Sequence, residues 1–276
     1  MSDDLSQLFN FTDTVAVLTG GGGVLCSTMS KALASAGAKV AVLDIAIEAA
    51  QRVVKEIEEE GGQALAVQCD VLSRDSIEKA ADAVIERYGQ VDILVNGAGG
   101  NKKEATTNQE SSFFDLPPDA VQWVFNLNFL GTLLPSQIFG KRMVEQGEGI
   151  ILNISSMNAF RPLTRIPAYS GAKAAVSNFT QWLAVHVAQE YSPKIRVNAL
   201  APGFFLTDQN RFLLTDEQSG ELTPRGRQII DHTPQARFGD PEDLLGTMFW
   251  LLSPASEFVT GVIVPIDGGF SAYSGV

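Results

Sequence analysis

Short apolar runs rich in β-branched residues alternate with longer amphipathic stretches from residue 14 onward. Runs of this kind, bounded by glycine, aspartate or asparagine, are typical of strands that are buried on both faces. The sequence predicts such strands at residues 14–19, 39–44, 64–70, 91–96, 149–155, 194–203 and 262–267.

Amphipathic stretches separate these runs. The sequence predicts helices over 46–61 and 73–89, and two longer helices that begin near Pro118 and Ala168. Regular alternation of strand and helix indicates a parallel sheet with right-handed connections. We therefore predict an α/β protein with one domain over residues 1–276: a doubly wound, Rossmann-type parallel sheet with helices on both faces.

Two stretches interrupt this alternation, at residues 99–118 and 204–240. Loops this long inside a compact α/β domain commonly form lids or substrate walls. We interpret 204–240 as a substrate-loop insertion. The alternative is a surface insertion without function.

Composition narrows the class of function. The formal net charge is −12, which argues against nucleic-acid binding, because that requires a basic surface. The two cysteines, Cys26 and Cys69, have no CxxC spacing and no neighbouring histidine, so we predict neither a disulfide nor a metal site. The acidic N-terminus does not resemble a signal peptide, and no apolar run is long enough to span a membrane. We expect a cytoplasmic protein.

A glycine-rich turn, TGGGGVLC, follows the first predicted strand at residues 19–26. Glycines allow a diphosphate to approach the backbone, and the helix that follows offers free N–H groups. A tight turn alone also needs glycine, but Asp44 ends the second strand about 20 residues later, where a dinucleotide fold binds the adenosine ribose. Asp44 repels the phosphate of NADP, and Ile45 and Ala46 offer no cation, so we predict NAD. As an alternative, Asp44 is only a helix N-cap.

The next two strands end in Cys69-Asp70-Val71 and in NGAGG at 96–100. Ligands bind at the carboxyl ends of the strands in open α/β sheets. Asp70 is suited to the adenine amino group, and Gly97, Ala98 and Gly99 leave room for the ribose. Taken singly, these are turn residues. Together they line one groove.

Tyr169 and Lys173 stand four residues apart in AYSGAKAA, so both project from one helical face. An ammonium near a phenol favours the phenolate, so we predict a lowered pKa for Tyr169, as a general base requires. An exposed Tyr/Lys pair is the ordinary alternative. Ser156, at the end of the fifth strand, favours the catalytic interpretation. Asn128 is polar within an apolar helix, where it can also simply bond a neighbouring carbonyl.

Together these residues resemble the short-chain dehydrogenase/reductase family over residues 12–270. The resemblance rests on Thr19-Gly20, NGAG at 96–99, Asn128, Ser156, Tyr169-x-x-x-Lys173, Pro202-Gly203 with Thr207, and DGG at 267–269. It implies that Tyr169 is the catalytic acid/base, Ser156 polarises the reacting oxygen, Lys173 also holds the nicotinamide ribose, and Asn128 supports a proton-relaying water.

The same resemblance implies a set of cofactor-binding residues: Gly20, Gly22, Gly23, Val24, Leu25, Asp44, Asp70, Val71, Asn96, Ala98, Gly99, Tyr169, Lys173, Pro202, Gly203, Phe205 and Thr207. One feature departs from the family. The turn usually reads TGxxxGxG, but Val24 and Cys26 occupy the second and third glycine positions.

Within the family, NGAGGN, ISSMNAFRPLTRIPAYS and APGFFLTDQNR are similar to the sugar-acid branch of D-mannonate oxidoreductases, the fructuronate reductases. This similarity implies NAD-dependent hydride transfer between D-mannonate and D-fructuronate. A sugar acid needs a cation for its carboxylate. The candidate substrate residues in loops at this sheet edge are Asn158 and Arg161, which we prefer, and Lys102, Lys103, Arg211 and His232. For each, a solvated surface role is the alternative.

Two other functions fit the sequence. One is another sugar or polyol dehydrogenase, such as a gluconate 5-dehydrogenase. The other is a catalytically silent NAD-binding module, although such a module has no use for the whole catalytic set. The apolar faces near 119–145 and 168–190 and the tail FSAYSGV are suited to subunit packing, and the family resemblance implies a homotetramer or homodimer.

Overall fold

The computed structural model describes residues 8–207, 214–216 and 219–275. One sheet carries seven parallel strands in the order β3-β2-β1-β4-β5-β6-β7. Each predicted strand is present: β2 spans the predicted residues, and the ends of the other strands are shifted by at most two residues. The strands are β1 Val15–Thr19, β2 Lys39–Asp44, β3 Gln63–Gln68, β4 Ile93–Asn96, β5 Gly149–Ile154, β6 Ile195–Pro202 and β7 Ile263–Ile266.

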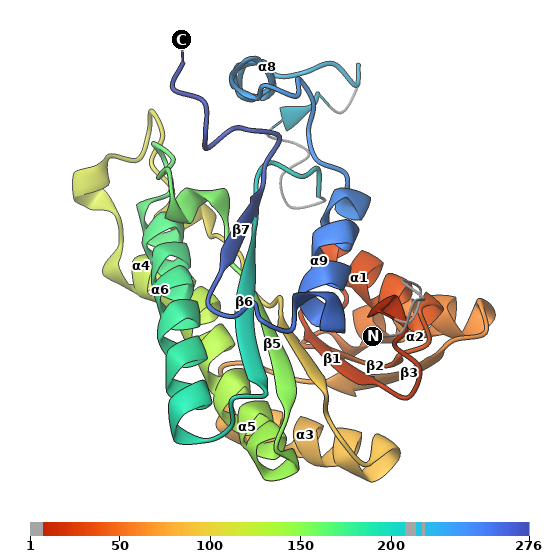
Figure 1. The fold of residues 1–276 in the computed structure, drawn as a ribbon. Coiled ribbons are helices and arrows are strands. Elements are labelled where there is room, and N and C mark those ends of the chain that lie inside the picture. The colour runs from red at the N-terminus through yellow and green to blue at the C-terminus, as the bar shows by residue number, and fades with distance from the viewer. Residues whose placement is uncertain (1–7, 208–213, 217–218, 276) are drawn as a thin grey trace.

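Helices cover both faces of this sheet (Figure 1). They are α1 Val24–Ser35, α2 Ile47–Glu59, α3 Arg74–Tyr88, α4 Pro118–Phe125, α5 Gly131–Gln146, α6 Pro167–Glu190, α8 Pro224–His232 and α9 Leu245–Leu252. A π-helical turn, η4 Asn126–Leu130, joins α4 to α5. This architecture confirms the predicted doubly wound α/β fold.

Alternate residues of the strands enter two separate cores because successive side chains of a strand point to opposite faces. Ala16 and Leu18 of β1 pack with α1, α2 and α9. Val15 and Val17 of the same strand pack with α3, α5 and α6. Every residue of β1 is buried, which explains why its sequence is apolar throughout instead of alternating.

The side of the sheet on which successive strands are added changes at β1. The chain adds β2 and β3 on one side and then returns to place β4 on the other, where Thr19 pairs with Asn96. A crevice at the carboxyl ends of the strands forms at such a point. β1 and β4 therefore define where a ligand site is expected.

The two irregular stretches lie at this carboxyl edge. Residues 99–118 contain two short 3₁₀ turns, Lys103–Ala105 and Phe113–Asp115. The later stretch contains α8, which lies beside the C-terminal segment above the strand ends (Figure 1). Within the described residues, no helix is both long and apolar enough to cross a membrane.

Candidate active site

The glycine-rich turn runs from the end of β1 into α1. Gly20 has a φ of +62°, and a Cβ there would lie 2.8 Å from the Cα of Ala98. At Gly22 a Cβ would lie 2.5 Å from the Cβ of Ala49. Gly23 caps α1 with no side-chain hydrogen bond, so the first N–H groups of that helix are left for a ligand. The turn thus has the form of a phosphate cradle.

Cys26 occupies the position of the family's third glycine. It is buried, and burial raises its pKa to about 12, so the thiol is neutral. A Cβ on Gly97 would collide with the Sγ of Cys26. The departure from the family pattern is therefore accommodated by glycine across the crevice, in the turn after β4.

Asp44 lies at the end of β2 beside this turn. Its Oδ2 accepts a hydrogen bond from the N–H of Gly22 at 3.0 Å, and its Oδ1 accepts one from Ala46 at 3.0 Å. Each carboxylate oxygen keeps a second lone pair. Ile45 and Ala46, which follow it, are exposed and carry no charge. The carboxylate is thus oriented, half-exposed and suited to accept from the hydroxyls of a ribose.

The other predicted cofactor residues lie along the same edge. Thr19 Oγ1 accepts from the N–H groups of Gly97 and Ala98 at 3.1 and 3.3 Å, which ties β1 to the turn after β4. The Oδ1 of Asp70 caps its own turn by accepting from Leu72 at 2.9 Å. The side chain of Asn96 instead points into the core.

Asn96 belongs to a buried network. Its Nδ2 donates to Ser136 at 2.9 Å and to the Oδ1 of Asn153 at 2.8 Å. Asn153 in turn donates to Thr180 at 2.8 Å. This network joins β4 and β5 to α5 and α6. The Asn96 side chain therefore supports the floor of the site, and only its backbone lies at the strand end.

Beyond β6, the chain passes close to the end of β7. A Cβ on Gly203 would lie 2.6 Å from that of Asp267, so glycine is required there. Pro202 ends the strand and Phe205 is buried. The other predicted cofactor residues are also described: Leu25 and Val24 open α1, Val71 is buried beside Gly131, and Thr207 ends the described segment.

Lys173, Asn128 and Gly99 meet at the centre of the site. A Cβ on Gly99 would lie 2.7 Å from Asn128 Oδ1 and 3.2 Å from Lys173 Nζ. Lys173 is buried and donates to the carbonyl of Ile154 at 2.8 Å. Glycine at position 99 is what allows the two polar groups to share this space.

Asn128 lies in the π-helical turn. Its Nδ2 donates to the carbonyls of Val124 and Gly100, each at 2.7 Å, and its Oδ1 accepts from the N–H of Gly100 at 3.2 Å. The bond to Val124 is the one expected of any helical asparagine. The paired bonds to Gly100 are additional, and they hold the turn after β4 against the helix.

Tyr169 and Ser156 are neighbours in the site. The Ser156 hydroxyl lies near enough to the phenol to lower its pKa, and Lys173 Nζ lies 5.6 Å from the centre of the tyrosine ring. Ser156 Oγ also accepts from Asn158, from the backbone N–H at 3.3 Å and from Nδ2 at 3.2 Å. The structure thus brings the four predicted catalytic residues to one edge of the sheet.

The predicted pKa of Tyr169 is wrong for this structure. Burial raises the pKa of the phenol, and the neighbouring Ser156 hydroxyl opposes that rise only in part. The Lys173 ammonium is directed at Ile154, and burial lowers its own pKa to about 8. The four-residue spacing of Tyr169 and Lys173 in the sequence gives no information on how far either side chain is removed from water.

The predicted substrate residues are placed differently from one another. Asn158 is buried, and its Oδ1 accepts from Leu163 while its Nδ2 donates to Ser156. Arg161 is exposed and donates to the carbonyl of Phe160. Lys102 lies over the ring of Trp123 at 5.4 Å, and Lys103 is exposed. Arg211 lies outside the described residues.

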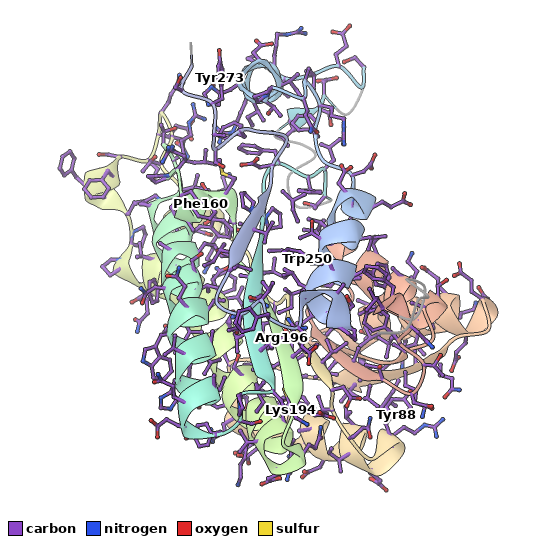
Figure 2. All side chains as sticks on the ribbon, viewed as in Figure 1. Tyr88, Phe160, Lys194, Arg196, Trp250 and Tyr273 are labelled. Atoms are coloured by element: carbon purple, nitrogen blue, oxygen red, sulfur yellow. The ribbon has the colours of Figure 1, made fainter. Side chains whose placement is uncertain are left out.

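A cavity of about 910 Å³ opens between residues 162–164 of the loop after Ser156, α8 and the C-terminal segment. His232 lines it between Phe270 and Tyr273, with ring centroids 4.6 and 5.1 Å away. In Figure 2 Tyr273 lies at the carboxyl end of the sheet, far from Lys194 and Tyr88 at the other end.

Sequence reasoning missed Arg225, which also lines the cavity. It lies inside the predicted insertion, in LTPRGR, where Pro224 at a helix start was an available signal. Among the described residues, no cluster of three histidine, cysteine, aspartate or glutamate side chains is arranged to hold a metal ion.

Comparison with known proteins extends this picture. A family model described as short chain dehydrogenase matches residues 14–218. The uncharacterised oxidoreductase UxuB of Bacillus subtilis (strain 168) is 51% identical over 276 residues, covering 97% of this chain and 98% of that protein. The 2-dehydro-3-deoxy-D-gluconate 5-dehydrogenase of Escherichia coli (strain K12) is 33% identical over 266 residues, covering 96% and 98%.

A solved structure is also similar over the whole chain. It is that of a protein from Haemophilus influenza provisionally named a D-mannonate oxidoreductase, with bound NAD. The two share 48% identity and a TM-score of 0.91, covering 99% of this chain and 100% of the other. With the fold, the reversal of strand order between β1 and β4, and the positions of Ser156, Tyr169 and Lys173, these matches show that the chain belongs to the short-chain dehydrogenase/reductase family, whose members oxidise CH–OH groups or reduce the corresponding carbonyl groups with NAD(P).

Proposed function

We propose that this protein is an NAD-dependent oxidoreductase that interconverts D-mannonate and D-fructuronate. The observation that carries the proposal is the full-length similarity to the Haemophilus influenza structure, which bears both the mannonate name and NAD. That similarity includes the segments that surround the cavity, because 99% of this chain is covered.

NAD fits the residues at the crevice. The turn at Gly20–Gly23 and the uncapped start of α1 would hold the diphosphate, and Asp44 the adenosine ribose. Asp44 and the uncharged Ile45 and Ala46 favour NAD over NADP, whose extra phosphate would meet a carboxylate without a cation. When bound, the nicotinamide supplies the acceptor for the hydride that leaves the carbinol carbon.

The chain's own residues handle the proton. In the oxidation direction the ionised oxygen of Tyr169 takes the hydroxyl proton of the substrate, and in reduction the phenol returns it. The Ser156 hydroxyl, which lies near the phenol, would donate to the same substrate oxygen. Because burial raises the pKa of Tyr169, the ionised form depends on these neighbours and on the nearby Lys173.

Lys173 and Asn128 complete the proton path. The two side chains approach each other across Gly99, and Asn128 is fixed by its paired bonds to Gly100. With a pKa of about 8, Lys173 can exchange a proton near neutral pH. Asn128 would hold the water that connects Lys173 to solvent.

The insertion at 204–240 would form the substrate wall, since α8 lines the cavity. A gluconate 5-dehydrogenase is the alternative, because the chain is also similar to an enzyme named for a gluconate derivative. As further parts of the proposal, the protein acts in the cytoplasm and assembles as a homotetramer or homodimer.

A substrate panel tests the proposal. Purified protein is mixed with D-mannonate, D-gluconate or neutral hexitols, each with NAD and with NADP, and reduced nicotinamide is followed by absorbance. We expect kcat/KM to be at least about tenfold higher for D-mannonate than for the others, and higher with NAD. Preference for gluconate would select the alternative. If no alcohol is turned over, the result would favour the alternative that the protein is a catalytically silent NAD-binding module.

A further inference from the structure

We propose that Arg225, with Arg165 beside it, binds the carboxylate of the substrate. The inference rests on the proposed function only for the substrate class, a sugar acid. It replaces Arg161 as the preferred cation, because Arg161 is exposed and bonds its own neighbour's carbonyl instead of lining the cavity.

The backbone at Arg225 is anchored at the cavity wall. Arg225 is the second residue of α8 and is half-buried. The first turn of this helix is capped by Thr223, whose Oγ1 accepts from the N–H of Gly226 at 3.0 Å. Gly226 itself packs so closely on the carbonyl of Leu214 that no Cβ fits there. The backbone that carries the guanidinium is therefore anchored on two sides.

Among the described residues, the Arg225 guanidinium has no acidic partner. In the described part of the chain, neither Arg225 nor Arg165 forms an ion pair with a carboxylate. Burial, and after it the charge of Arg165, lower the pKa of Arg225. Arg225 at the cavity wall, with the exposed Arg165 near enough for its charge to act on it, forms a local site for an anion in a chain of net charge −12.

The second arginine belongs to the loop that joins the two catalytic residues. Arg165 lies between Ser156 and Tyr169, and its carbonyl accepts from the backbone N–H of Thr107 at 2.9 Å. Its neighbour Thr164 lines the cavity. The same loop therefore bears the reacting groups at its two ends and a cation in between. A hexonate needs this separation, because its carboxylate lies several carbons from the carbon that is oxidised.

Other charges at the cavity are arranged differently. Arg227 and Asp231 both line it from α8, and both are exposed. Their charges are opposite in sign and offset each other, whereas Arg225 is a half-buried cation. A guanidinium with restricted access to water binds a carboxylate more strongly than an exposed one.

The experiment compares Arg225→Met, Arg225→Lys and Arg165→Met with Arg87→Met, a control that removes an exposed arginine at the far end of α3. Steady-state rates are measured with D-mannonate and with the neutral hexitol D-mannitol. Binding is measured separately, by calorimetric titration of D-mannonate into the Tyr169→Phe protein saturated with NAD, with and without Arg225→Met. NADH affinity and thermal unfolding report whether each variant is folded.

For Arg225→Met we expect KM for D-mannonate to rise roughly 10- to 100-fold with little change in kcat, as for the loss of one charge-assisted contact. Activity on D-mannitol, which has no carboxylate, should fall by a much smaller factor than activity on D-mannonate, and Arg225→Lys should recover part of the affinity for D-mannonate. Arg165→Met should have a smaller effect, and Arg87→Met none. Unchanged KM and unchanged calorimetric affinity in folded Arg225→Met would overturn the inference while leaving the proposed function intact.

The proposed function and the proposed carboxylate site at Arg225 can be contradicted independently of each other. If the wild-type protein does not turn over D-mannonate, titration of D-gluconate into the same pair of proteins still tests the arginine. Loss of that binding in Arg225→Met supports the carboxylate site although the proposed substrate is wrong. Equal binding of D-gluconate, D-mannonate and D-mannitol by both proteins overturns it.

Discussion

Tyr169 and Lys173 each carry a desolvation cost that the rest of the site must offset. The phenol has a raised pKa and the ammonium a pKa lowered to about 8, both because of burial. Neither shift helps the chain to fold. Both are explained if the pair is retained for proton transfer, because functional sites are where such costs are concentrated.

Replacing Lys173 should therefore stabilise the protein near neutral pH. Its pKa in the folded chain, about 8, lies below the ordinary 10.5, so below pH 8 the folded chain holds an unfavourable buried ammonium. We expect Lys173→Met to raise the free energy of unfolding at pH 7 by about 1–3 kcal/mol, after the loss of the bond to Ile154 is subtracted. Urea unfolding measures this.

The difference in the free energy of unfolding between Lys173→Met and the wild type should decrease as the pH rises from 8 to 10.5. Between pH 8 and 10.5 the unfolded wild-type chain binds a proton that the folded chain does not, so wild-type stability gains on the variant as the pH rises. The advantage of Lys173→Met should be small by pH 10. The control, Lys141→Met, removes an exposed ammonium and should show no such trend. A less stable Lys173→Met at pH 7 would contradict the account.

At the residue scale, the sequence identified which groups meet but not their environment. The positions of Ser156, Tyr169 and Lys173 follow from strand ends and helical spacing. The role of Asn158 does not, because its amide is used between Ser156 and Leu163, a contact made only when the loop folds back. Arg225 was missed for the same reason: only the fold brings it to Arg165.

Among the elements, α9 depends on a buried arginine of β6. Arg196 donates to the carbonyls of Leu251 at 2.9 Å, Ser253 at 3.3 Å and Val259 at 3.1 Å. Two of these lie at the C-terminal end of α9, where carbonyls have no helical partner and a cation is favourable. Through these hydrogen bonds Arg196 connects the C-terminal end of α9 to strand β6 of the sheet.

Arg196→Met should destabilise the protein by roughly 2–4 kcal/mol, since it leaves several buried carbonyls unsatisfied. Urea unfolding is the measurement. Lys194→Met is the matched control two residues earlier, because the side chain of Lys194 is 74% exposed and forms only a 3.8 Å ion pair. Equal free energies of unfolding for Arg196→Met and Lys194→Met would show that the hydrogen bonds of Arg196 do not stabilise the attachment of α9.

Element positions were largely predictable, and element details were not. The strand at 39–44 occurs at the predicted residues because apolar residues fill it and Asp44 ends it. The long helix predicted from Pro118 is interrupted by a π-helical turn at Asn126–Leu130. Apolar periodicity does not reveal that turn or the hydrogen bonds that Asn128 forms within it to Gly100 of a distant loop.

At the scale of the whole molecule, one exposed surface is unusually aromatic. Rings contact in sequence along η4 and α6, from Phe129 through Phe179, Trp182 and His186 to Tyr191. Trp182 and Tyr191 are 55% and 58% exposed. Large contiguous apolar patches are typical of protein interfaces, which agrees with the proposed homo-oligomer.

We expect Trp182→Glu to lower the oligomeric state, because a carboxylate at the centre of an apolar interface is desolvated without a partner. Sedimentation velocity should give a dimer or tetramer for the wild type and a smaller species for the variant. Lys55→Glu introduces the same group on exposed α2 and should not change the mass. The same sedimentation coefficient for wild type and Trp182→Glu would count against this surface.

We propose that the Tyr169 oxygen transfers the substrate proton beside bound NAD. The most direct test is the turnover of Tyr169→Phe, measured with the substrate that the wild type uses best, together with NADH affinity measured by fluorescence titration. We predict that turnover falls by at least about 100-fold while NADH affinity changes by less than about threefold, since only the reacting hydroxyl is removed. Turnover near the wild-type rate in Tyr169→Phe would contradict the account.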